Sequence, residues 1–431
     1  MNRTFALGLA LVSTWRAPTP VPETLKADPR ITLEFGEQRL VMAGGLQPSM
    51  VGTSSGTLIV QAQTTEKPHP AKRISYPSAI ETVVSRDGGN TWMNFPRKPG
   101  ENGLNFEGGA LQLHNGRIIA LDTYVTPVAG PGAGAGQIYF STDDWETLQG
   151  PVDISFQIPG VNFRGSSDDY GRAHEAVRLH RRILELPNGD LLTTLYGWFE
   201  GDVATATYMP TMRRTRSVLL RSNDEGRSWK LVSTIAVGPE VGTEGFGEPV
   251  LARASAGAHA GRLRCYMRTG RDLYETWSDD EGRTWAPPRA IDFGVLGLHD
   301  TEKWAAMFHG VKDPKGNPVE LTGAAVDPEV LELRSGVWVC AVGARIPARA
   351  CWPRAEYPGN GDYLAISLDQ GETWSHVVRF TSGVLTTHYT AVVEMKSDNE
   401  IFVAYDLGDW SSGKGRSIFG RAVKIAVAPA K

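Results

Sequence analysis

The sequence predicts an all-β fold in which six four-stranded units surround a common axis, a six-bladed β-propeller. Two repeats support this prediction: a short polar turn motif that ends in tryptophan, and a longer unit of two apolar strands joined by a turn. The composition agrees, because 48 glycines, 27 prolines and 12 tryptophans suit a chain with many strands and tight turns. A propeller grows by adding blades to one body, so we expect residues 21–431 to form a single domain.

The short turn motif reads Ser-x-Asp-x-Gly-x-Thr/Ser-Trp. Its Ser and Asp side chains can accept hydrogen bonds from turn amides, and its Gly can adopt a positive φ, so the motif suits a tight hairpin. In a fifth, altered copy at residues 141–148, Trp145 occupies the glycine position. We predict that each copy joins the two outer strands of a blade. The intact copies are residues 85–92, 222–229, 278–285 and 367–374.

The longer repeat lies between these turns. We predict that each copy forms the two inner strands of one blade, joined by a hairpin such as the Pro-Asn-Gly-Asp turn at 187–190. The last blade lacks a turn motif, and residues 417–428 and 31–35 are predicted to complete it and close the ring. The six copies are residues 47–63, 107–123, 180–196, 248–268, 327–345 and 389–406.

The charge and composition exclude several classes of function. The formal net charge of −4 is small and no block of like charge stands out, which argues against nucleic-acid binding. No segment is apolar for long enough to span a membrane. Three cysteines are too few for a disulfide framework. No spacing of metal ligands and no Gly-x-Ser-x-Gly run is present, so we expect neither a metal nor another cofactor.

Residues 1–20 are predicted to be a leader. One arginine precedes a short apolar run at residues 5–12, as in a secretion signal, although a clean cleavage site is missing. A secreted or periplasmic protein follows if this segment is a signal, and a cytoplasmic one otherwise. An ordered first strand is the alternative for the same residues.

The residues that open the six inner strands are all polar. Each can form hydrogen bonds, and five of the six can ionise. In a propeller the innermost strands line the axis, so these side chains should converge at one mouth. Leaving such groups buried and unpaired is costly, so we expect them either to bond to one another or to line a binding site. They are Gln47, Glu107, His180, Glu248, Asp327 and Tyr389.

The turn motif resembles the Asp-box, or BNR repeat, of the sialidase (neuraminidase) superfamily, in which it is a structural turn on the outer rim. In that family blade four opens with Glu and its paired strand ends with Arg, as Glu248 and Arg268 do here. A late Arg in blade five and an opening Tyr in blade six match Arg345 and Tyr389. The resemblance implies an exo-acting glycoside hydrolase on a carbohydrate with an anionic terminus. Tyr389 would be the nucleophile and Glu248 its base, with both arginines binding the anion.

This assignment is chemically coherent. A neutral tyrosine, with a pKa of about 10, is a poor nucleophile until a nearby carboxylate takes its proton. Glycosidases normally use two carboxylates, and sialidases are an exception with a tyrosine nucleophile. A carboxylate nucleophile would repel a substrate that itself carries a carboxylate. Two arginines can hold such an anion through forked hydrogen bonds.

Two features depart from the sialidase pattern. Gln47 replaces the first arginine of that family's triad, and the insertion at 64–78 lacks the family's acidic Asp. The proton donor is therefore unassigned, and the candidates are Glu107, Asp327 and His180, whose imidazole has a suitable intrinsic pKa. The insertion offers instead Glu66, Lys67, His69, Lys72, Arg73 and Tyr76.

Further residues are candidates for substrate binding. Gln47 lies in the predicted ring, and Arg182, next to Arg181, can bind an anionic sugar. Trp198 can stack on a sugar face, with Tyr124 and Trp410 as alternatives.

Two other functions stay open. One is a lyase that cleaves uronate-containing polysaccharides by elimination, with His180, Tyr389 and Arg182 supplying the base, the acid and the neutralising charge. The other is a non-catalytic glycan-binding propeller, because an arginine and the acid of the sialidase pattern are replaced.

Overall fold

We describe the protein from a computed structural model. It describes residues 19–429 except for 65–78, 97–103, 170–171, 208–210, 313–315, 317–320, 349–350, 352–356, 358 and 409–414. Nearly all of the predicted leader at 1–20 and of the insertion at 64–78 lies outside the described residues, and so does Trp410.

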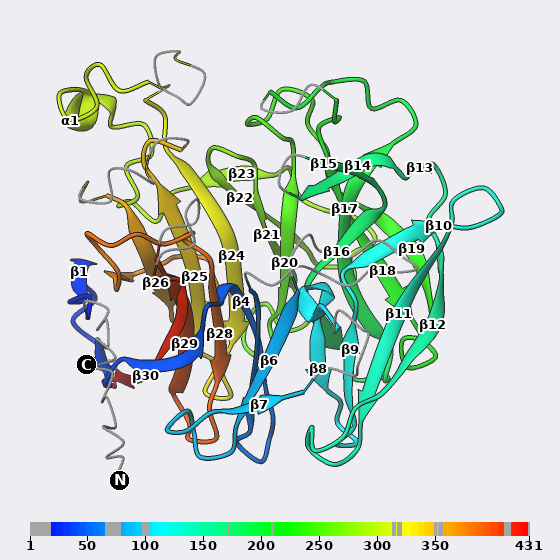
Figure 1. The fold of residues 1–431 in the computed structure, drawn as a ribbon, viewed down its shortest axis with the longest axis horizontal. Coiled ribbons are helices and arrows are strands. Elements are labelled where there is room, and N and C mark those ends of the chain that lie inside the picture. Colours follow the sequence, from blue (N-terminus) through cyan, green and yellow to red (C-terminus); the bar gives the residue numbers. More distant parts are fainter. Residues whose placement is uncertain are drawn as a thin grey trace, which may run out of the picture.

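Almost all regular structure is β-strand, which confirms the predicted all-β class. The described residues contain one short α-helix, α1 (Thr301–Ala305), and one turn of 3-10 helix, η1 (Phe106–Gly108). The helix α1 lies outside the sheets, in the connection between two of them (Figure 1). No helix among the described residues is long and apolar enough to cross a membrane.

Four separate sheets are built from neighbouring strands that pair antiparallel, and two of them recruit strands from the N-terminus. The first sheet contains β4 (Leu46–Gly52), β5 (Leu58–Gln63), β6 (Ile80–Ser85) and β7 (Met93–Phe95). The second contains β20 (Gly247–Arg253), β21 (Leu263–Arg268), β22 (Leu273–Ser278) and β23 (Arg289–Ile291). The third contains β24 (Ala324–Glu332), β25 (Trp338–Arg345), β26 (Gly361–Ser367), β27 (His376–Arg379) and β1 (Glu23–Lys26). The fourth contains β28 (Thr390–Glu394), β29 (Glu400–Leu407), β30 (Ser417–Val427), β2 (Ile31–Phe35) and β3 (Arg39–Ala43).

The remaining large sheet has ten strands and closes on itself, because β10 pairs with both β16 and β11. It contains two antiparallel four-stranded units, β8–β9–β11–β12 and β16–β17–β18–β19, whose outer strands β12 and β19 pair in parallel. Its strands are β8 (Ala110–Gln112), β9 (Ile118–Leu121), β10 (Tyr124–Pro127), β11 (Ala133–Ser141), β12 (Gln149–Gln157), β13 (Val161–Asn162), β16 (Val177–Glu185), β17 (Leu191–Phe199), β18 (Arg216–Ser222) and β19 (Ser228–Ala236). A small hairpin lies apart, formed by β14 (Arg164–Asp169) and β15 (Arg172–Glu175).

The opening strands of all these units meet side by side in a ring, which makes the arrangement propeller-like. In order, β4 contacts β8, then β16, β20, β24 and β28 follow, and β28 contacts β4 again. The strand β2 pairs with β30, so an N-terminal strand completes the C-terminal sheet, as predicted (Figure 1). Buried apolar side chains fill the space between neighbouring sheets; one such cluster joins Val250 and Tyr266 to Trp338 and Trp374.

A bulge interrupts the start of four opening strands. The pairing register shifts by one extra residue in β4, β20 and β24 and by two extra residues in β16. A left-handed backbone is uncommon outside glycine, and a bulge re-aims the side chains beside it. These bulges therefore set the direction of the side chains at the mouth. Each of the four bulges contains one residue with a positive φ: Gln47 (56°), Arg181 (57°), Glu248 (43°) and Asp327 (54°).

The five turn motifs fold alike, as hairpin turns between outer strands. In the copy at 278–285, Ser278 Oγ donates to Asp280 Oδ1 at 2.7 Å and accepts from the Gly282 N–H at 2.9 Å. Thr284 donates to both oxygens of Asp280, from its N–H at 2.9 Å and its Oγ1 at 2.7 Å. The other four copies repeat this set. In the altered copy Trp145 has a φ of 67° and buries its ring beside Phe95.

Candidate active site

Three side chains from two sheets form a closed triangle at the mouth of the ring, Glu248 and Arg268 from one sheet and Tyr389 from another. The Tyr389 hydroxyl donates to Glu248 Oε1 at 2.6 Å. Arg268 Nη1 donates to the same carboxylate oxygen at 2.8 Å and to the Tyr389 oxygen at 2.8 Å. The predicted phenol and glutamate therefore share a hydrogen bond, although 141 residues separate them in the chain.

The charges around this triangle keep the proton on the phenol. Burial alone would raise the pKa of Glu248, but the Arg268 charge, His180 and the Tyr389 hydrogen bond together lower that pKa to about 2. Burial, and then the neighbouring Glu248 charge, raise the pKa of Tyr389 well above its usual value. At neutral pH the pair is thus a phenol beside a carboxylate, the starting state for proton transfer from oxygen to oxygen.

Two arginines adjoin the phenol from separate strands. Besides the triangle, Arg268 forms an ion pair with Glu244 at 2.6 Å. Arg345 lies over the Tyr389 ring, 5.4 Å from its centroid. Its Nε and Nη2 donate to the Thr387 carbonyl at 3.1 and 2.7 Å. Both predicted arginines therefore border the phenol, and Glu244 was not predicted.

Asp327 lies next to the triangle but is fully buried. Its N–H donates to Glu248 Oε2 at 3.2 Å, and its Oδ2 accepts from the Thr390 N–H at 2.9 Å. Its Oδ1 pairs with Arg181 Nη2 at 2.5 Å. Burial raises the pKa of Asp327, and the Arg181 guanidinium acts in the opposite direction. A fully buried side chain does not contact a substrate. This geometry therefore favours a structural role for Asp327 over the predicted role of proton donor.

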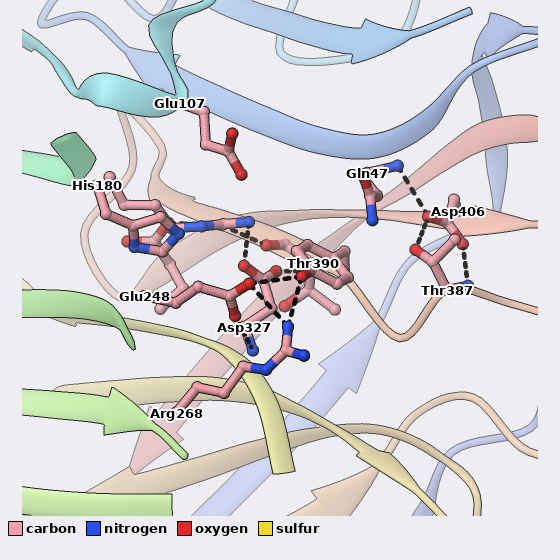
Figure 2. A network of polar contacts seen from close by, with 12 residues as sticks. Gln47, Glu107, His180, Glu248, Arg268, Asp327, Thr387, Thr390 and Asp406 are labelled. Carbon is pink, nitrogen blue, oxygen red and sulfur yellow. Dashed lines mark hydrogen bonds and ion pairs between the residues drawn. The ribbon is translucent and has the colours of Figure 1, made fainter. Parts of the chain in front are cut away.

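Glu107 and His180 also lie at this mouth, His180 beside Glu248 and Glu107 across from it (Figure 2). Figure 2 shows the Glu107 carboxylate directed toward Glu248 and Asp327. Glu107 follows the cap of η1, and its Oε2 pairs with Arg178 at 2.5 Å. Burial, and then the charge of Arg181, which is the next residue in the chain, lower the pKa of His180 to about 4. This histidine is therefore neutral at neutral pH, with Nδ1 3.3 Å from the Pro249 carbonyl oxygen.

Gln47 belongs to a separate part of the mouth, beside Asp406 (Figure 2). Its N–H donates to Asp406 Oδ2 at 2.8 Å, and its Oε1 accepts from Gln63 Nε2 at 2.5 Å. A small pocket opens here, lined by Gln47, Ser49, Gln61, Ala62, Gln63, Ile80, Asn105 and Glu107.

Arg182 and Trp198, the other predicted substrate-binding residues, are not part of the triangle. Arg182 is held by Glu329 Oε1 at 2.6 Å and by the Val392 carbonyl at 3.1 Å, so its guanidinium already has a carboxylate partner. Trp198 is partly buried in β17, and its strand pairs with β13.

The structure thus brings Tyr389, Glu248 and Asp327 into direct contact. Glu107 and His180 lie at the same mouth, and Gln47 lies at one side. The structure adds residues that sequence reasoning did not assign. Arg181 was noticed only as a neighbour of Arg182, yet it reaches across the centre to β24 and β28. Its positive φ could not be seen in the sequence. The other unassigned residues are Arg178, Glu244, Glu329 and Asp406.

No family model and no curated protein matches the chain. Solved structures match it over most of its length. A protein of unknown function from Dyadobacter fermentans is 17% identical with a TM-score of 0.60, over 92% of this chain and 100% of that one. A mutant of the α-L-arabinofuranosidase from Fusarium graminearum is 13% identical with a TM-score of 0.53, over 90% and 98%. A mutant of the NanB sialidase from Streptococcus pneumoniae is 12% identical with a TM-score of 0.51, over 90% and 70%.

The chain shares its fold with sialidases and arabinofuranosidases. The resemblance to sialidases that the turn motif indicated is therefore confirmed for the fold. At 12–17% identity the likeness concerns the backbone arrangement. The chemistry has to be argued from the side chains at the mouth.

Proposed function

We propose that this protein is a glycoside hydrolase with the architecture of a six-bladed β-propeller. The ring of six opening strands supports the blade number. In this interpretation the ten-stranded sheet is two blades whose outer edges touch through β12 and β19 and which β10 bridges. The five equivalent rim turns support the assignment of Asp-box repeats.

The observation that carries the proposal is the Tyr389–Glu248 hydrogen bond of 2.6 Å, with Arg268 donating to both oxygens. The phenol oxygen attacks the anomeric carbon while its proton passes to Glu248. The bond to the leaving oxygen breaks, and a glycosyl–tyrosine intermediate forms. Water then attacks the anomeric carbon and gives a proton to the group that had protonated the leaving oxygen. The bond to the tyrosine oxygen breaks, that oxygen regains its proton from Glu248, and the sugar is released with its original configuration.

The two arginines support the finer proposal of a sialidase-like, exo-acting enzyme on an anionic sugar terminus. A cation beside the phenol stabilises the phenolate that develops during attack, and it also attracts a substrate carboxylate. Arg268 and Arg345 hold this place. A tyrosine nucleophile suits such a substrate, because its neutral ground state does not repel the anion.

The leaving oxygen requires a proton, and Glu107 is the predicted acid that remains accessible. Its side chain is 12% exposed, whereas that of Asp327 is 0% exposed. Glu107 approaches the triangle from the opposite wall (Figure 2). We therefore assign Glu107 as the proton donor among the described residues. Substrate entry has to weaken its pairing with Arg178 for it to take up a proton.

The test combines an activity screen with one substitution. The wild-type protein is assayed on aryl α-sialosides, other ulosonic acid glycosides, α-L-arabinofuranosides and uronate polysaccharides, by release of reducing sugar and by ultraviolet absorbance. We expect hydrolysis without an unsaturated product, and we expect Tyr389→Phe to lower kcat at least about 10³-fold because the nucleophile is lost.

Tyr274→Phe is the matched control, since Tyr274 packs against Phe246 and pairs in the sheet with Met267, whose side chain points to the opposite face from that of Arg268. It should keep wild-type activity. An ultraviolet-absorbing product would instead indicate a lyase. Binding without turnover would indicate a glycan-binding propeller, and near-normal kcat in Tyr389→Phe would exclude the nucleophile assignment.

A further inference from the structure

A buried carboxylate holds the segment that leads into Tyr389. Asp406, in β29, is fully buried. Its Oδ1 accepts from Thr386 Oγ1 at 2.9 Å and from the Thr387 N–H at 2.6 Å. Its Oδ2 accepts from Thr387 Oγ1 and, at 2.8 Å, from the N–H of Gln47. One side chain therefore ties the residues before the phenol to the first strand of the neighbouring sheet.

A second buried carboxylate holds the residue on the other side of the phenol. Asp327 accepts from the Thr390 N–H at 2.9 Å, and its own N–H donates to Glu248 Oε2 at 3.2 Å. Asp327 thus touches the backbone next to the phenol and also the carboxylate that faces the phenol. The peptide of Tyr389 lies between two aspartates that belong to different sheets.

We infer that Asp406 and Asp327 are positioning residues, which hold the Tyr389 hydroxyl within hydrogen-bonding distance of Glu248. The inference rests on the proposed function of that pair. Both aspartates are 0% exposed, so they act through the backbone and not on the substrate. Misplacing a reacting group by about 1 Å can cost about 10²-fold in rate, so a rigid anchor on each side of the phenol has a kinetic purpose.

The contacts of Asp406 require a carboxylate. All four groups around it are donors, two on each oxygen. An ionised carboxylate is acceptor-only and can satisfy all four, whereas an asparagine would turn an NH₂ group toward two other donors. Asp406→Asn is therefore nearly isosteric but breaks the anchor on one side.

Asp362 offers a matched control. It is also a fully buried aspartate, in β26, and it lies near Asp406, because burial and then the Asp406 charge raise the pKa of Asp362. Among the described residues its carboxylate accepts from Thr381 Oγ1 at 2.9 Å and makes no hydrogen bond to residues 386–390. Asp362→Asn replaces a buried aspartate in the same region without touching the anchor.

The experiment monitors the Tyr389 phenol directly, through its ¹³C NMR signal. Protein labelled with ¹³C at the tyrosine ζ carbon is prepared as wild type, Asp406→Asn and Asp362→Asn, and the Tyr389 signal is assigned by its disappearance in Tyr389→Phe. We expect Asp406→Asn to shift this signal and to lower kcat about 10- to 100-fold on the glycoside found in the screen, with KM changed less than about threefold. Asp362→Asn should leave both unchanged.

A folded Asp406→Asn protein with an unchanged Tyr389 signal and wild-type kcat would overturn the inference. If Asp406→Asn does not fold, Thr387→Val removes one donor to the same carboxylate, and it should shift the signal and lower kcat in the same direction. If the wild type hydrolyses no glycoside, the proposed function fails, and the Tyr389 signal alone still decides whether Asp406 positions the phenol.

Discussion

The rim turns and the central mouth are two regions of the same sheets, and they are built in opposite ways. The hydrogen bonds that the rim turns share join residues at most four positions apart, as between Asp280 and Thr284. At the mouth, Tyr389 and Glu248 are 141 residues apart, and Asp327 and Glu248 are 79 apart. The rim repeats one set of contacts five times, whereas each opening strand brings a different side chain to the mouth.

The two regions also use carboxylates differently. A rim aspartate such as Asp224 accepts from neutral groups, among them Ser222 and Ser228 at 2.6 to 2.9 Å, and its turn covers the fully buried Trp229. At the mouth, Glu248 is paired with the Arg268 guanidinium. A group that satisfies a local turn contributes to stability, and a group held by charges from several sheets is prepared for chemistry. We therefore expect substitutions in the two regions to change different measured quantities.

The largest expected effect is at the mouth. Glu248→Gln removes the proposed base, so kcat per folded molecule should fall about 10²- to 10⁴-fold, and the free energy of unfolding should fall as well, because Arg268 loses one of its two carboxylate partners. Steady-state kinetics and denaturant unfolding measure the two quantities. The matched rim variant is Glu225→Gln, whose partly exposed ion pair with Arg117 should contribute less than about 1 kcal/mol. Equal kcat in Glu248→Gln and wild type would remove the distinction between the regions.

An intermediate effect is expected at the rim. Asp224→Ala leaves the Ser222 and Ser228 groups without their acceptor, so it should lower the free energy of unfolding by about 1–3 kcal/mol. The kcat per folded molecule should equal that of wild type. Asn223→Ala, at an exposed position of the same turn, is the control. A selective loss of kcat in Asp224→Ala would contradict a purely structural rim.

The third expected effect depends on pH and comes from Asp362. Burial raises the pKa of Asp362 in the folded state, so its contribution to stability is present below the unfolded pKa of about 3.9 and is lost as pH rises. Asp362→Asn does not titrate and should be more stable than wild type at pH 7, by about 1–3 kcal/mol, with the difference vanishing near pH 4. Unfolding curves from pH 4 to 8 test this, and a difference that grows toward acid would refute it.

Asp224 should respond to pH in the opposite sense. Burial alone would raise its pKa, but hydrogen bonds from Ser228 and Ser222 lower the pKa overall. The stability contributed by this rim aspartate is therefore present above the unfolded pKa and is lost as pH falls. Comparing Asp224→Ala with Asp362→Asn over the same pH range separates the two kinds of carboxylate.

Much of the fold could be predicted because its evidence is local. A Ser-x-Asp-x-Gly turn contains its own donors and acceptors, so the sequence of eight residues specifies the hairpin. Even the altered copy could be found, since Trp145 keeps the backbone bond to Ser141. The strand β2 could be paired with the last sheet because a ring has to close.

The site could be predicted only in part. Aligning the opening strands selected Tyr389 and Glu248, which meet, and also Gln47, which lies apart with Asp406. A bulge adds one residue and changes which side chain faces the axis, and its backbone conformation leaves no clear mark in the sequence. Arg181, one residue after His180, occupies the bulge of β16 for this reason.

The sequence by itself determined the all-β class, the rim turns, the strand order and the residue types available at the mouth, because each depends on interactions within a few residues or on a repeat. Only the tertiary structure decided which side chains share a proton, which carboxylates are buried, and which arginine each one meets. Those outcomes depend on distances between strands far apart in the chain and on the exclusion of water from the centre, and no local pattern encodes either of them.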